Sequence, residues 1–441
     1  MNAEEFMKRF YTIIGLLMLM FFADTGISQA QYDYLDIRNP YLRRIPIAIP
    51  PARTSPASQV SVTTADLLSE NLNFTGYFKI LDRGSFLIDP ANPPVDLPDI
   101  NFPNWTTIGS EMLITSYAIV QDELIEVEFR LFDTVKGQLL IGKKYKGWTR
   151  DLKKIVLRFC SEIIHYLTGD WGIFESRIAF ISNGTGNKEV WICDFDGSNP
   201  RAVTHSGSIT LNPAWSSDGN WLAYTSYERG RPDLYIRSLG GQIGAVVNKK
   251  GINTTPAWVP GKMMLAATLS FAGDQDIYLL DSGGNMIRKL TDKRGIDTSP
   301  TWSPDGSQMA FVSDRAGSPQ IYVKHIGSGR EERVTYEGKY NTQPSWSPKG
   351  DKIAYSSIER GEINIHILDL KSRTPIRLTY NSRGNESPSW SPDGSLIVFS
   401  STRDGGAKLY VMTAAGTDQR RLLSLPGQQT SPAWSARVTG E

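Results

Sequence analysis

The sequence predicts a two-domain protein, in which a small N-terminal α/β domain precedes an all-β, six-bladed β-propeller with four-stranded blades. Three observations predict this fold. A Pro-x-Trp phrase recurs every 43 or 44 residues, each repeat holds four strand-like segments, and helix patterns occur only in the first part of the chain. The tryptophans of the phrase are Trp215, Trp258, Trp302, Trp346, Trp390 and Trp434.

Residues 1–30 are predicted to be a secretory signal peptide. Lys8 and Arg9 precede an apolar run over 10–22, and small residues follow at Ser28 and Ala30. The run is shorter than the roughly 20 residues that span a bilayer. Cleavage after Ala30 is therefore favoured over anchoring, and we expect no transmembrane segment in the mature chain.

Residues 31–57 form a Pro-interrupted segment, which we expect to be an edge strand or an exposed arm. The α/β domain is expected over 58–170. Thr63, with Asp66 three residues on, signals the start of a helix.

Three strands with alternating apolar residues are expected over 112–120, 123–133 and 138–146. A second helix should begin at Leu152, because apolar residues recur there at the helical period, and Gly169 should end it.

The propeller is expected over 171–441. Its first repeat lacks a Pro-x-Trp strand ahead of it, and the last such strand, near 430–437, has no repeat after it. We therefore expect the C-terminal strand to join the first blade and close the ring. The single 43-residue spacing is attributed to a shorter turn, "VPGK", after Trp258.

The residue inventory predicts no enzyme. None of the common hydrolase or metal-binding motifs occurs in the mature chain, and the four histidines fall in different predicted elements. We expect no catalytic residue, metal ligand or cofactor. The near balance of 47 basic and 46 acidic residues, a net charge of +1, argues against nucleic-acid binding, and a monomer is expected.

The candidate functional surface is one mouth of the propeller channel, where the short polar triplets before each Pro-x-Trp should gather. Two interpretations stay open: a structural role in turns, and a ring that also receives a peptide or loop. The recurring Arg229, Arg315, Arg360 and Arg403 are expected to be solvated turn residues. The candidate partner-binding residues are Asn253, Thr255, Asp297, Ser299, Asn341, Gln343, Asn385 and Ser387.

Several phrases in this order resemble the TolB family, the periplasmic component of the Tol–Pal envelope system. They are "DIRNPYLRRIPIAIPPA", "GIFESRIAF", "DFDGSNPRAVT", "NPAWSSDG" and "SPSWSPDGSLIVFSS". The resemblance implies a periplasmic binding protein without enzymatic activity that supports outer-membrane integrity and constriction during cell division.

The resemblance also implies partners. The peptidoglycan-associated lipoprotein Pal would bind over the channel mouth, TolA would bind the N-terminal arm, and other outer-membrane proteins are further candidates. The arm candidates are Gln31, Tyr32, Asp33, Tyr34, Leu35, Asp36 and Ile37. The alternative is an accessory or inactive relative of a propeller-capped peptidase, because the propellers of those enzymes use similar phrases.

Overall fold

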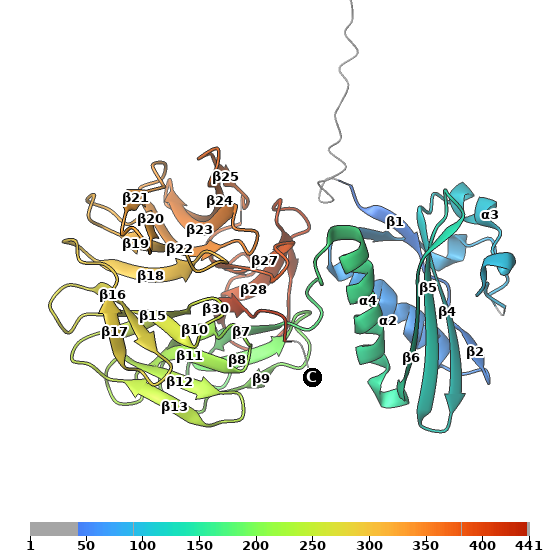
Figure 1. Ribbon diagram of the computed structural model, residues 1–441, viewed down its shortest axis with the longest axis horizontal. Coiled ribbons are helices and arrows are strands. Elements are labelled where there is room, and N and C mark those ends of the chain that lie inside the picture. Colours follow the sequence, from blue (N-terminus) through green and yellow to red (C-terminus); the bar gives the residue numbers. More distant parts are fainter. Residues whose placement is uncertain (1–42, 91, 381, 439–441) are drawn as a thin grey trace, which may run out of the picture. The chain divides into compact units, whose positions relative to one another are not determined.

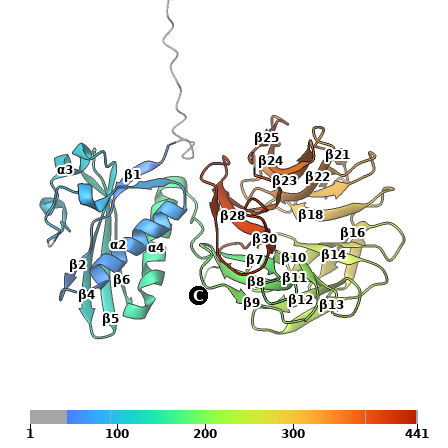
Figure 2. The same ribbon diagram turned by 180° about the vertical axis from the view of Figure 1, so that it is seen from behind.

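The computed structural model describes residues 43–90, 92–380 and 382–438. It contains a mixed six-stranded sheet with helices and six four-stranded sheets (Figures 1 and 2). The predicted signal peptide and the seven arm candidates lie outside the described residues. Within the described ranges, no helix is both long and apolar enough to cross a membrane.

The mixed sheet has the strand order β3-β1-β4-β5-β6, and β2 pairs with β4. Strands β4, β5 and β6 form an antiparallel meander, as the alternating pattern predicts, whereas β1 and β2 run parallel to β4. The strands are β1 (Ile45–Ala48), β2 (Arg53–Ser55), β3 (Phe78–Ile80), β4 (Met112–Gln121), β5 (Leu124–Asp133) and β6 (Gln138–Trp148).

The position of β1 differs from the expected arm. This strand lies inside the sheet between β3 and β4 rather than at its edge, and Ile47, Ala48 and Ile49 are almost completely buried. The described sheet therefore begins within 31–57. A parallel neighbour on each side explains why this short run is apolar throughout rather than alternating.

Two long helices, α2 (Val60–Phe74) and α4 (Leu152–Thr168), lie together on one face of the mixed sheet (Figure 1), and a short helix α3 spans Phe102–Thr107. Helix α4 ends as predicted, because Gly169 adopts φ 81° and donates its N–H to His165. Helix α2 begins before Thr63, whose hydroxyl donates to the Gln59 carbonyl instead of capping the helix.

The propeller has six blades of four antiparallel strands, as predicted. The first blade combines β30 (Gln429–Trp434) with β7 (Arg177–Ser182), β8 (Glu189–Asp194) and β9 (Arg201–Ala202). The C-terminal strand therefore closes the ring, and its Trp434 indole donates to the Ser176 hydroxyl at 2.8 Å.

The other five blades each follow the chain from the innermost to the outermost strand. Their strands are β10 (Thr210–Trp215), β11 (Trp221–Ser226), β12 (Asp233–Ser238) and β13 (Ile243–Val247); β14 (Asn253–Trp258), β15 (Met264–Leu269), β16 (Asp276–Asp281) and β17 (Met286–Lys289); β18 (Asp297–Trp302), β19 (Gln308–Ser313), β20 (Gln320–His325) and β21 (Glu331–Arg333); β22 (Tyr340–Trp346), β23 (Lys352–Glu359), β24 (Glu362–Asp369) and β25 (Pro375–Arg377); and β26 (Asn385–Trp390), β27 (Leu396–Ser401), β28 (Lys408–Thr413) and β29 (Arg420–Arg421).

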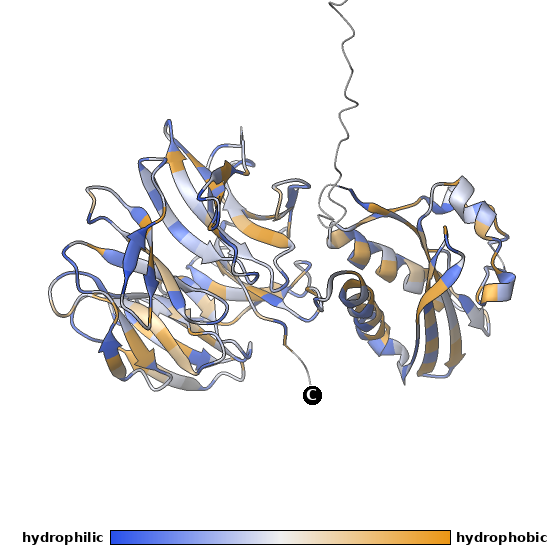
Figure 3. Ribbon diagram, turned by 45° about the horizontal axis from the view of Figure 1, so that its top comes forward, coloured by the Kyte–Doolittle hydropathy of each residue, from blue (hydrophilic) through white to orange (hydrophobic). Residues whose placement is uncertain are grey.

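Blade-to-blade packing forms the core of the propeller. One apolar cluster joins Leu265 and Tyr278 of one blade to Ala223 and Ile236 of the preceding blade. The repeated tryptophan also links blades: the Trp302 indole donates to the Ala257 carbonyl at 3.1 Å. Apolar residues line many strands and helices, whereas many connections are hydrophilic (Figure 3).

Serine and aspartate side chains hydrogen-bond to each other in the turns that follow Trp215, Trp302, Trp346 and Trp390. In the turn after Trp302, hydrogen bonds from Ser303 and Ser307 lower the pKa of Asp305 to about 2.

The turn after Trp258 has the same length as the turn after Trp302, so a shorter turn does not explain the 43-residue spacing. The missing residue lies instead between β12 and β14, upstream of Trp258.

Candidate functional site at the channel mouth

Each inner strand of the propeller contains a bulge at the same place. In β18 the register shifts between Thr298 and Thr301, and the equivalent shift occurs in the other five inner strands. The residue just before the proline has a positive φ in every copy. We call these six residues the channel ring: Asn212 (51°), Thr255 (47°), Ser299 (53°), Gln343 (53°), Ser387 (56°) and Ser431 (50°).

This backbone conformation is unfavourable for the residues that adopt it. A positive φ is uncommon for any residue other than glycine and is a clear outlier for the β-branched Thr255. A following proline further disfavours helical backbone angles. Such strain costs on the order of 1 kcal/mol or more per residue and persists only where the surroundings impose it. In the channel ring, the bulge and the packing of the blades impose the positive φ on all six residues.

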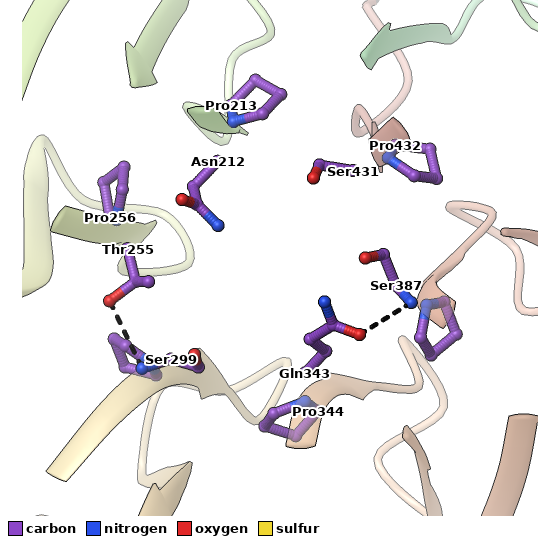
Figure 4. A pocket seen from close by; sticks show the side chains of 12 residues that line it. Asn212, Pro213, Thr255, Pro256, Ser299, Gln343, Pro344, Ser387, Ser431 and Pro432 are labelled. Atoms are coloured by element: carbon purple, nitrogen blue, oxygen red, sulfur yellow. Dashed lines mark hydrogen bonds between the residues drawn. The ribbon is translucent and has the colours of Figure 1, made fainter. Parts of the chain in front are cut away.

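The channel ring and the prolines that follow it line one pocket of about 140 Å³. Side chains of Asn212, Gln343, Ser387 and Ser431 surround a common opening in Figure 4. The lining contains hydroxyl groups, carboxamides and proline rings, and no titratable side chain. The pocket therefore offers neutral hydrogen-bonding groups to whatever enters it.

Hydrogen bonds between blades hold part of the ring in place (Figure 4). The Ser299 N–H donates to the Thr255 hydroxyl at 3.3 Å, and the Ser387 N–H donates to the Gln343 side-chain oxygen at 3.0 Å. The same Gln343 oxygen accepts from the Ser356 hydroxyl at 2.8 Å. These side chains are thus ordered before any partner arrives.

The structure separates the predicted site residues into two layers. Thr255, Ser299, Gln343 and Ser387 are half-buried and belong to the channel ring. The other four lie two residues earlier in their strands and are completely buried: Asn253, Asp297, Asn341 and Asn385. They lie at the starts of their strands and do not line the pocket, which only the ring residues and their prolines do.

Two ring members are absent from the predicted set. Asn212 and Ser431 occupy the same place in their strands as Ser299. Both could have been found from the sequence, because each directly precedes the proline of a Pro-x-Trp phrase, in "NPAW" and "SPAW".

Hydrogen bonds connect three of the four buried residues to neighbouring side chains. Asn341 donates to Gln320 at 2.8 Å, and Arg403 donates to Asn385 at 3.0 Å. Arg315 donates to Asp297 at 2.7 Å. Burial raises the pKa of Asp297, and hydrogen bonds from Ser313 and Arg315 oppose that rise.

Arg315 and Arg403 are therefore not the solvated turn residues that the sequence suggested. The Arg315 side chain is only 13% exposed and lies over the Tyr322 ring at 4.9 Å, and Arg403 lies over the Tyr410 ring at 4.4 Å. Arg229 and Arg360 are exposed, as expected.

Exposed apolar side chains surround the mouth at which the inner strands begin. They lie on the connections that enter an inner strand, near its start, or on the turns between the second and third strands of a blade. They are Ile209, Tyr227, Phe271, Ile296, Tyr336, Tyr340 and Tyr380. Concentrated exposed aromatic residues are a feature of protein–protein interfaces.

A metal centre was not expected from the sequence. Across 43–90, 92–380 and 382–438, no group of three or more His, Cys, Asp or Glu side chains is arranged to hold a metal ion. The two described cysteines, Cys160 and Cys193, are both buried and unpaired with each other, and burial raises the pKa of each thiol.

Comparison with known proteins gives matches over both domains. The family model of the TolB β-propeller domain matches residues 164–438 of the sequence, and the family model of the TolB amino-terminal domain matches residues 33–140. The Tol-Pal system protein TolB of Desulfosudis oleivorans is 55% identical over 288 residues, which are 64% of this chain and 65% of that protein. The protein TolB homolog of Chlorobaculum tepidum is 42% identical, over 63% of each chain.

The matched region thus spans just under two thirds of the length of these curated relatives. A solved structure extends the similarity: the crystal structure of TolB from Acinetobacter baumannii superposes with a TM-score of 0.78 at 28% identity, covering 89% of this chain and 97% of that one. The propeller match alone covers more than half of the chain, and the chain therefore belongs to the TolB family.

Proposed function

We propose that this protein is a non-enzymatic periplasmic component of a Tol–Pal system. In this proposal it binds the lipoprotein Pal over the channel mouth and TolA through residues 31–37, and so supports outer-membrane integrity and constriction at division. The observation that carries the Pal part is the channel ring, a neutral, pre-ordered pocket surrounded by exposed aromatic residues.

The physical basis of binding is pre-organisation. A partner loop that enters the ring meets hydroxyl and carboxamide groups whose positions the blades already fix, so little entropy is lost in ordering them. Backbone strain at positive φ fits this interpretation, because such strain clusters at ligand-binding sites. The names of the curated relatives support membership of a Tol–Pal system.

Arginine at the ring should block partner binding. Ser387→Arg and Ser299→Arg each place a long cation in a pocket of about 140 Å³, and each is expected to weaken Pal binding at least about tenfold, or 1.4 kcal/mol. The measurement is titration calorimetry with purified soluble Pal, together with a thermal melt that confirms folding.

Matched variants separate binding from folding. Ser328→Arg places the same side chain in an exposed turn between β20 and β21 and should leave affinity unchanged. Ser387→Gly removes the side chain and relieves the positive φ, so its melting temperature should not fall. Wild-type affinity in folded Ser299→Arg and Ser387→Arg would contradict the proposed mouth site.

Deletion of residues 31–37 tests the proposed binding of TolA, because these residues are the proposed TolA-binding segment. The shortened mature protein should lose TolA capture, and if the arm responds to Pal, its Pal affinity should change as well. Pull-down with the soluble domains of both partners gives the result. Deletion of 439–441 serves as a control, and unchanged TolA capture after the arm deletion would argue against this role.

A further inference from the structure

The channel ring has a property that creates a problem for docking. Its six members come from six equivalent strands, share one backbone conformation and carry only neutral hydroxyl or carboxamide groups, so the ring is close to six-fold symmetric in backbone and in charge. A partner that contacted only the ring could dock in several rotations about the channel axis with similar energy. A single docked orientation requires a feature that distinguishes the blades.

Charge on the connections that enter the inner strands supplies such a feature. Four consecutive connections carry exposed cations, and we call this group the cation arc: Lys249, Lys250, Lys293, Arg294, Lys339 and Arg383. The remaining two connections, residues 203–209 and 422–428, contain no lysine or arginine. Among these six connections, lysine and arginine are therefore confined to four that follow one another around the mouth.

Most of this charge is not neutralised within the described chain. Lys293 lies 3.6 Å from Glu331, whereas no ion pair is found for the other five members among the described residues. The same four connections carry two acids, Asp292 and Glu337. Because the whole chain has a net charge of only +1, the surplus is a local property of this surface.

The neighbouring turns do not cancel the surplus. The turns between second and third strands, which lie at the same end of the blades, are close to balanced. Their cations are Lys188, Arg229, Arg231, Arg315, Arg360 and Arg403, and their acids are Glu228, Asp274, Asp314 and Asp404. Two further acids, Glu359 and Glu362, flank the short turn that holds Arg360.

Exposed aromatic side chains stand among the arc cations in fixed positions. Tyr336 is 73% exposed, lies against the Arg333 guanidinium at 4.9 Å, and donates its hydroxyl to the Arg333 carbonyl at 3.0 Å. Tyr380 is 59% exposed and makes the same contacts with Arg377 at 4.8 and 2.8 Å. Two adjacent blades thus present fixed aromatic side chains on the same connections as Lys339 and Arg383.

We propose that the cation arc binds an acidic surface of the protein partner that docks over the mouth, and that it fixes the rotation of that partner about the channel axis. The inference rests on the proposed function and adds the charge and orientation of the partner. The fixed tyrosines favour a shaped protein surface over a planar anionic membrane, because stacked and hydrogen-bonded rings suit contacts of defined geometry.

Charge reversal tests the first part. The variant Lys249→Glu, Lys250→Glu, Arg294→Glu, Lys339→Glu should weaken binding of soluble Pal by at least about thirtyfold at 50 mM salt, mainly through the association rate. Wild-type affinity should fall as salt rises, and that of the variant should not. The matched control reverses four exposed lysines that form no ion pair among the described residues and lie outside the arc: Lys79, Lys154, Lys262 and Lys371.

The control should change affinity less than about threefold at the same salt concentration. Equal losses in both variants would show that net charge alone matters and would overturn the arc. Absence of Pal binding by the wild-type protein would instead refute the proposed function. Tight binding of the wild type, but not of the arc variant, to phosphatidylglycerol vesicles without binding to Pal would assign the arc to a membrane.

Photo-crosslinking tests the second part. A photoreactive residue at Tyr336, in the same connection as Lys339, and another at Ile209, in a connection without lysine or arginine, should capture different segments of the partner. Capture of the same mixture of segments from both positions by the wild-type protein would refute a fixed rotation.

Discussion

Arg315→Met is expected to lower the free energy of unfolding by about 3 kcal/mol. Removal of one partner from a buried ion pair leaves an uncompensated charge and typically costs 3–5 kcal/mol. In this protein the Asp297 side chain is completely buried and loses its pair at 2.7 Å. Glu331 retains its ion pair with Lys324 at 2.8 Å, so the substitution leaves Asp297 as the buried carboxylate without a cation. Urea denaturation of the purified protein measures the change.

The loss should depend on pH. Because burial raises the pKa of Asp297 above its ordinary value of 3.8, the carboxyl group without Arg315 should remain protonated to higher pH in the folded state than in the unfolded state. Below its pKa in the unfolded state, this carboxyl group is protonated in both states and does not lower the free energy of unfolding. The free energy of unfolding falls as pH rises through the folded-state pKa. The destabilisation of Arg315→Met should therefore be small near pH 4 and full at pH 7.

The repeat itself provides a rescue. The residue equivalent to Asp297 is Asn253 in the preceding blade, where Phe271 stands in place of the arginine. Asp297→Asn combined with Arg315→Met should therefore recover most of the stability, whereas Arg360→Met in an exposed turn should have little effect. Equal stability losses in the single and double variants would show that the arginine acts by packing over Phe311 and Tyr322 rather than by charge.

Truncation after residue 428 is expected to leave the propeller without a stable fold at ordinary temperatures, so that no cooperative unfolding transition is observed. It removes β30, which pairs with β7, and with it Trp434, which donates to Ser176. The loss exposes the edge of β7 together with the apolar surface that Ala433 covers. Because a domain is stable by only about 5–15 kcal/mol, loss of a whole inner strand should leave an aggregation-prone chain.

A second truncation isolates the strand as the cause. Truncation after residue 438 retains β30 and should melt like the full chain. A synthetic peptide of residues 429–438, added to the shorter chain during refolding, should restore a soluble monomer by pairing with the open edge. Size-exclusion chromatography and circular-dichroism melts give both results, and an unchanged melt for the shorter chain would contradict the need for ring closure.

The propeller could be predicted because its determinants recur in the sequence. Each blade pairs consecutive strands, so Trp302 and its equivalents report the same local arrangement six times, and the unmatched strand ending at Trp434 indicates how the ring closes. The interior position of β1 could not be predicted, because Ile45–Ala48 is short and its neighbours in the sheet, β3 and β4, are distant in sequence.

The sequence by itself determined the blades, the ring closure and the region of the chain from which a mouth would form, because these depend on periodic local patterns. Only the tertiary structure decided which polar residues face that mouth. Asp297 and Ser299 look equally polar in the sequence, but a bulge with positive φ places Ser299 in the ring, whereas Arg315 from the turn after the next strand covers Asp297. The difference arises from blade packing and backbone strain, which residue type does not encode.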